Sequence, residues 1–236
     1  QIYVPSYASA AKQSQIALYG AEVIPVEGPR KAAETAAQAA VTPSRAYASH
    51  AYNPAYLAGQ VTAAYELWEQ LGKRAPDWII LPVAQGGQFL GYWFGFSNLL
   101  QAGLVDHLPR LVAVQSAQIA PIAHACQEGL DHIPSVTQAG PTAAEGVAIP
   151  KPVRGKRLLQ ALRETNGRAI AIEEEQLLSA HKQLARSGFY IEPTSALAIA
   201  GLEQLSNEIS DGETVVLPLT GNGLKSEPPS SKVEKR

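Results

Sequence analysis

Cysteine, methionine and long apolar runs are scarce in this sequence, and each scarcity excludes a class of protein. The 236 residues contain no methionine and one cysteine, Cys126, so no disulfide can form within the chain. With nothing that marks an oxidising compartment, a cytoplasmic location is the default expectation. No apolar run reaches the roughly 20 residues that a membrane-spanning helix needs, so we predict no membrane partner.

A surplus of charge of either sign is also absent. The chain carries 19 Lys and Arg against 21 Asp and Glu, a formal net charge of −2. Without a basic surplus, we predict no nucleic-acid partner. The five histidines show none of the spacings that bind zinc, and we predict no metal site: they are His50, His107, His124, His132 and His181.

The lack of methionine extends to the first position, because the chain begins at Gln1. A translated chain starts with methionine. The next residues, IYVP at 2–5, already have the composition of a core strand without any lead-in. We therefore expect the chain to be a piece of a longer protein.

Apolar runs of strand length are present throughout the chain and alternate with stretches that favour helix. We predict strands at 2–4, 22–26, 78–84, 111–115, 168–172 and 214–219. The run at 78–84, WIILPVA, is apolar on both faces, which is typical of a parallel strand covered by helices on both sides. Strands that alternate with helices indicate an α/β fold with right-handed crossovers.

Glycine marks the expected ends of the helices. We predict helices at 9–19, 54–71, 88–102, 173–186 and 193–205, the first four ending at or near Gly20, Gly72, Gly103 and Gly188. Two stretches look irregular: 42–53, which we expect to join two domains, and 131–155, which is rich in Pro and Gly and is expected to cover a site. The polar residues 226–236, SEPPSSKVEKR, are expected to form a disordered tail.

Two glycine-rich turns follow two of the predicted strands. Gln85-Gly86-Gly87-Gln88 follows 78–84, and residues 220–223, TGNG, follow 214–219. Ligands of open parallel sheets bind at the carboxyl ends of the strands, and glycine N–H groups at a helix start suit a phosphate. The alternative for the first turn is a tight strand-to-helix connection. Thr220 can bond a heteroaromatic ring nitrogen, or it can act only as a cap or turn residue.

Several segments, taken in order, resemble the threonine synthase family. The order is far more specific than any one motif. The segments are AYNPAYLAGQVTAAYELWEQL at 51–71, PDWIILPVAQGGQFLGYWFGF at 76–96, LPRLVAVQSAQIAPI at 108–122, TAAEGVAIPKPVRGKRLLQALRETNG at 142–167, IEPTSALAIAGL at 191–202 and LTGNGLK at 219–225.

The resemblance implies the fold type II architecture of pyridoxal-phosphate enzymes, with mostly parallel sheets covered by helices. It also implies a lyase of threonine biosynthesis, which converts O-phosphohomoserine and water to threonine and phosphate. The cofactor would be pyridoxal 5′-phosphate, the partner a small amino-acid substrate, and the expected assembly a homodimer. By the same resemblance, Gln85, Gly86, Gly87 and Gln88 would hold the cofactor phosphate. Thr220 would bond the pyridine nitrogen.

The resemblance also divides the chain. Residues 1–48 match the end of the family's small α/β domain, residues 49–225 match most of the large cofactor-binding domain, and 226–236 form the tail. The family's Schiff-base lysine lies in a Ser-Phe-Lys-Asp-Arg-like segment before the strand matched by IYVP, followed by a Ser-Gly-Asn loop. Neither segment is in this sequence. The resemblance therefore assigns no catalytic residue here, and the N-terminal part of the fold is expected to be missing.

Three places depart from the family pattern. Ala84, Gln85 and Gln88 change the usual Gly-Asn-Gly-Gly-Asn loop; Ala58 replaces a common glutamate, and Asn222 a common histidine. Two alternatives therefore stay open: another fold type II lyase, such as a Ser/Thr dehydratase, and a catalytically inactive, truncated homologue. The YNP, AEG and EPTSA segments favour threonine synthase.

Overall fold

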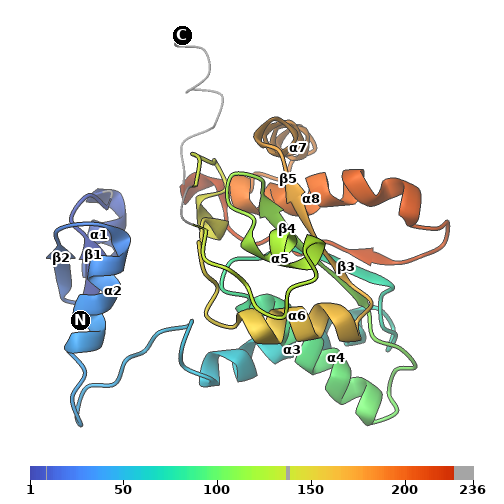
Figure 1. Cartoon of the computed structure of the whole chain (residues 1–236), viewed down its shortest axis with the longest axis horizontal. Helices are drawn as coiled ribbons and strands as arrows, with labels where there is room; N and C mark the ends of the chain where they lie inside the picture. Colours follow the sequence, from blue (N-terminus) through green and yellow to red (C-terminus); the bar gives the residue numbers. More distant parts are fainter. Residues whose placement is uncertain (9, 137–138, 226–236) are drawn as a thin grey trace. The chain divides into compact units, whose positions relative to one another are not determined.

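The computed structural model describes residues 1–8, 10–136 and 139–225, and the chain forms two compact units (Figure 1). The first unit is residues 1–53, and the second begins at Pro54. The boundary lies at the end of the 42–53 stretch that we expected to join two domains. The predicted tail, 226–236, lies outside the described residues.

The first unit is built on a two-stranded parallel sheet. Strands β1 (Ile2–Pro5) and β2 (Val23–Val26) pair with Tyr3 opposite Ile24. Helices α1 (Ala10–Leu18) and α2 (Arg30–Ala39) complete the unit. Val4 of β1 and Ala33 of α2 are buried, so they form the small core between sheet and helix.

The second unit contains a four-stranded, fully parallel sheet with the order β5–β4–β3–β6. The strands are β3 (Trp78–Pro82), β4 (Arg110–Ser116), β5 (Arg168–Ile172) and β6 (Val215–Val216). The register places Ile80 opposite Val112 and Ile79 opposite Val216. The predicted α/β fold with parallel strands is confirmed.

Helices cover both faces of this sheet, which explains why its central strands are apolar on both sides. On one face, Ile79 and Leu81 pack with Leu158 in a core formed with α3 (Ala55–Gln70), α4 (Gly87–Gln101), α5 (Pro121–Gln127) and α6 (Gly155–Glu164). On the other, Ile80 and Val112 pack against α7 (Glu174–Arg186) and α8 (Pro193–Leu205). Figure 1 shows the two groups of helices on opposite sides of β3, β4 and β5.

The helix ends agree well with the glycine signals. Gly20, Gly72, Gly103 and Gly188 all have φ between 68° and 90°, a left-handed conformation that ends a helix without the steric cost of a Cβ. The predicted C-caps are confirmed.

Two elements differ from the predictions. The strand predicted at 214–219 is only two residues long, β6, at the edge of the sheet. Pro218 has no N–H to donate to a neighbouring strand, which limits pairing beyond Val216. Helix α6 was not predicted, although Leu158, Leu159 and Leu162 have helical spacing and are buried.

Candidate functional site

The first glycine turn lies between the carboxyl end of β3 and the start of α4. Gly86 is the residue before the helix and has φ of 81°, and Gly87 is the first helical residue. The first bond of the helix runs from the Leu90 N–H to the Gly86 carbonyl, at 2.9 Å. The N–H groups that precede Leu90 therefore lie before the first intrahelical bond, at the positive end of the helix dipole. This is the geometry that binds anions.

Space as well as conformation requires glycine at position 86. A Cβ built on Gly86 would overlap the side chain of Leu158, which is fully buried in the core. A Cβ on Gly87 would meet nothing within 4 Å. The turn is therefore packed on the Gly86 side and open on the Gly87 side.

The two glutamines of the turn have different partners. The Gln85 side-chain oxygen accepts a hydrogen bond of 2.9 Å from the Val153 N–H, which ties the turn to the segment before α6. The Gln88 amide donates along the helix to the Tyr92 hydroxyl at 3.5 Å. Burial raises the pKa of the Tyr92 phenol. Tyr92 therefore stays a neutral partner for Gln88.

Gln115, at the carboxyl end of β4, supports the same edge of the sheet and was not predicted as a site residue. Its side chain is fully buried and donates to the Val83 carbonyl at 3.3 Å. Its side-chain oxygen accepts from the N–H groups of Ile122 and Ala123, at 2.8 and 3.3 Å. Gln115 thus joins the chain that leads into the glycine turn to the first turn of α5.

The second predicted turn is held by the segment that leads into α8. The Glu192 N–H donates to the Gly221 carbonyl at 2.9 Å, and the Gly223 N–H donates to the Tyr190 carbonyl at 3.1 Å. An isolated β-bridge pairs Ile191 with Asn222 between them. These backbone contacts fix the position of Thr220.

The Thr220 hydroxyl faces another hydroxyl. Its oxygen lies 3.1 Å from Oγ of Ser195, which is fully buried in the first turn of α8. Thr220 itself is exposed. One side of this hydroxyl therefore has a protein partner, while the residue remains accessible to a ligand.

The structure brings the predicted site residues to one edge of the sheet. β3 and β6 are parallel neighbours, and the two turns follow their carboxyl ends. The predicted residues Gln85, Gly86, Gly87 and Gln88 belong to the first turn, and Thr220 to the second. In open parallel sheets, this edge is where ligands bind.

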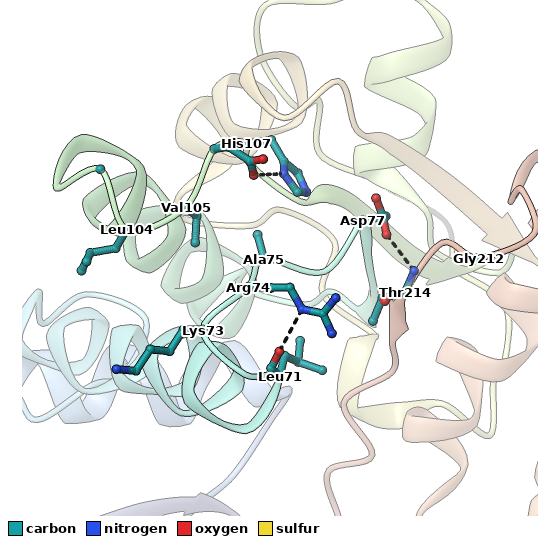
Figure 2. A pocket seen from close by; sticks show the side chains of 12 residues that line it. Leu71, Lys73, Arg74, Ala75, Asp77, Leu104, Val105, His107, Gly212 and Thr214 are labelled. Carbon is teal, nitrogen blue, oxygen red and sulfur yellow. Dashed lines mark hydrogen bonds and ion pairs between the residues drawn. The ribbon is translucent and has the colours of Figure 1, made fainter.

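A cavity of about 540 Å³ lies at the opposite, amino-terminal edge of the sheet. Asp77 and Thr214, which precede β3 and β6, line it together with Arg74 and His107 (Figure 2). Its charged groups bond to neighbours: the Asp77 carboxylate accepts from the Thr214 N–H at 2.7 Å, and Arg74 Nε donates to the Leu71 carbonyl at 3.4 Å. This cavity is separate from the two glycine-rich turns.

Metal-ligating side chains do not cluster in the part of the chain that the structure describes. Within residues 1–8, 10–136 and 139–225, no three His, Cys, Asp or Glu side chains come together to hold a metal ion. Over the same ranges, no helix has the length and hydrophobicity to cross a membrane.

Comparison with known proteins gives matches over almost the whole chain. The family described as "Pyridoxal-phosphate dependent enzyme" matches residues 1–221. A threonine synthase of Synechocystis sp. is 34% identical over 220 residues, 93% of this chain and 55% of that protein. A threonine synthase of Methanocaldococcus jannaschii is 35% identical over 218 residues, 91% of this chain and 53% of that protein. The chain thus spans about half the length of the curated relatives that it matches.

Solved structures share the fold. The fungal L-serine ammonia-lyase from Rhizomucor miehei superposes with a TM-score of 0.78 at 21% identity, covering 93% of this chain and 68% of that one. A threonine deaminase from the organism abbreviated T.th. gives 0.73 at 24% identity, covering 93% and 69%.

Proposed function

Because the chain belongs to the family of pyridoxal-phosphate dependent enzymes, we propose that it forms the cofactor-binding part of an enzyme that makes threonine and phosphate from O-phosphohomoserine and water. The fold type II architecture and the pyridoxal-phosphate cofactor, both expected from the sequence, are confirmed by the family match and the structural neighbours. The threonine synthases among the relatives support this choice of reaction.

The first turn fits the cofactor phosphate. The N–H groups at the start of α4 supply donors and the positive end of a helix dipole, and an anion needs both. Gly86 supplies the left-handed turn that aims them, and Gly87 leaves open space in front of them. In this proposal Gln85, Gly86, Gly87 and Gln88 hold the phosphate. This turn is the observation that carries the proposed function.

The second turn fits the pyridine ring. A threonine hydroxyl is neutral, and its single proton can be donated to a ring nitrogen. Thr220 is exposed and held by backbone contacts, so it can orient the ring without adding a charge. A neutral partner leaves the ring nitrogen less protonated than a carboxylate would.

When bound, the cofactor supplies the electron sink that this chemistry requires, and the protein supplies binding and orientation. The chain's own residues do the second part. The turn at Gly86 binds the phosphate end, Thr220 binds the ring end, and Gln85 ties the segment at Val153 to the phosphate end.

The remaining expectations form part of the same proposal. Residues 1–48 would be the end of the small domain, and 49–225 the large domain. The protein would act in the cytoplasm as a homodimer on an amino-acid substrate.

The test uses protein expressed from the complete coding sequence and loaded with pyridoxal phosphate. We expect O-phosphohomoserine to yield threonine and phosphate in equal amounts, and Thr220→Val, which keeps the shape of the side chain, to reduce this turnover. L-Serine and L-threonine are supplied in parallel, and ammonia and the oxo acid are measured. If ammonia is released while O-phosphohomoserine gives no threonine, the enzyme is a dehydratase. If none of these substrates reacts, the proposal is wrong.

A further inference from the structure

A second hydroxyl lies beside the proposed ring-binding residue, and the proposed function does not account for it. Ser195 Oγ is 3.1 Å from Thr220 Oγ1, although the two residues are 25 positions apart in the sequence. A hydroxyl has one proton and can also accept. The direction of the Ser195–Thr220 bond therefore decides whether the Thr220 proton is free for a ligand.

The position of Ser195 is fixed by packing. Its side chain is fully buried, and the residues that follow it, Ala196 and Leu197, are buried as well. The Ser195 N–H donates to the Glu192 carbonyl at 3.0 Å, which closes the first turn of α8. Because it is shut off from solvent, the hydroxyl must bond to a protein group.

The usual alternative acceptor for this hydroxyl already has a donor. A serine inside a helix often donates to the carbonyl four residues earlier, which here belongs to Ile191. His181 Nε2 lies 2.8 Å from that carbonyl oxygen, and a carbonyl can only accept, so His181 carries its proton on Nε2. Donation from Ser195 is therefore directed to Thr220.

We propose that Ser195 is a positioning residue that donates to Thr220 and so turns the only proton of Thr220 toward the pyridine nitrogen of the bound cofactor. This rests on the proposed function. The ring nitrogen then acts as an acceptor and is held in its neutral form. Ser195 itself does not touch the cofactor.

The test measures binding of two probes to the complete apoprotein: pyridoxal phosphate, and its analogue in which C–H replaces the ring nitrogen. We expect Ser195→Ala to weaken pyridoxal phosphate by about threefold to tenfold, the range of one neutral hydrogen bond, and to leave the analogue unchanged. Ser195→Thr keeps the hydroxyl and is expected to restore binding. In a Thr220→Val background, Ser195→Ala is expected to have no further effect.

The outcomes separate this inference from the proposed function. If the unmodified protein binds neither probe, the proposed cofactor site is wrong. If it binds both, and Ser195→Ala weakens both equally or neither, Ser195 has only a packing role and the inference is overturned. Should Ser195→Ala unfold, Ser195→Cys replaces it, because a thiol fills the space but donates weakly. The same selective loss is then expected.

Discussion

The side-chain oxygen of Gln85 accepts a hydrogen bond of 2.9 Å from the Val153 N–H, 68 residues away in the sequence. The turn proposed to hold the cofactor phosphate is thereby joined to the irregular stretch that leads into α6. From the sequence we expect this stretch to cover a site, and Gln85 is a direct link between the two.

Shortening Gln85 by one methylene should release this link. We expect Gln85→Asn to raise the hydrogen-exchange rate of the Val153 amide by about threefold to tenfold, since one neutral hydrogen bond is lost. Gln88→Asn is the matched control, because Gln88 bonds to Tyr92 within its own helix. An unchanged Val153 rate in Gln85→Asn, or the same increase in both variants, would contradict this prediction.

Gly86 should be far more sensitive to alanine than another glycine of similar backbone conformation. Gly72 has φ of 68° and open space at its Cβ position, so Gly72→Ala is expected to cost about 1 kcal/mol of backbone strain. Gly86→Ala adds overlap with Leu158, which typically costs a further 1–3 kcal/mol or so. Urea unfolding of both variants measures the difference.

Leu158→Ala provides the internal check on that explanation. In this background the overlap is removed, and Gly86→Ala should cost no more than Gly72→Ala. If Gly86→Ala is equally costly with and without Leu158, the overlap is not the cause.

The sequence predicted those parts of the fold that depend on local signals. Gly20, Gly72, Gly103 and Gly188 end helices because a left-handed residue is cheap for glycine, and this holds without knowledge of the tertiary structure. The strand at 78–84 could be predicted because burial on both faces leaves a continuous apolar run. Helix α6 was missed because its buried leucines follow a stretch of prolines and glycines.

The candidate site was only partly readable from the sequence. The glycine turn and Thr220 follow predicted strands, so their place at one edge of a parallel sheet could be expected. Gln115 and Ser195 could not be assigned roles, because their partners lie in other elements. A polar residue at the end of the apolar run LVAVQ was the signal for Gln115, but its bonds to Val83 and Ile122 depend on the tertiary fold.

Gln115 should therefore contribute strongly to stability. Gln115→Leu leaves the Val83 carbonyl and the N–H groups of Ile122 and Ala123 without this partner inside the protein. We expect a loss of about 2–4 kcal/mol in the free energy of unfolding, since each unsatisfied buried group costs about 1–3 kcal/mol. Gln101→Leu, at the exposed end of α4, is the control and should change stability by less than about 0.5 kcal/mol. Similar losses in both variants would show that Gln115 does not support this edge of the sheet.

Glu213 should make stability depend on pH. The Ser210 N–H, at 2.7 Å, and then the Trp78 indole N–H, at 3.1 Å, hold the pKa of the Glu213 carboxyl below its ordinary value of 4.5. A carboxyl whose pKa is lowered by folding stabilises the native state above pH 4.5. That contribution is lost as the pH falls below 4.5 through the lower folded pKa, because protonation in the native state then becomes necessary.

We therefore expect the stability advantage of the unmodified protein over Glu213→Gln to be constant near neutral pH and to shrink from roughly pH 5 to pH 3. Glutamine can still accept from Trp78 but does not titrate, so the difference isolates the carboxylate. Urea unfolding followed by tryptophan fluorescence at several pH values measures it, and Glu203→Gln, on the exposed face of α8, gives the background of removing a surface carboxylate. A difference that stays constant down to the lowest pH would show that the Ser210 and Trp78 contacts do not favour the charged form.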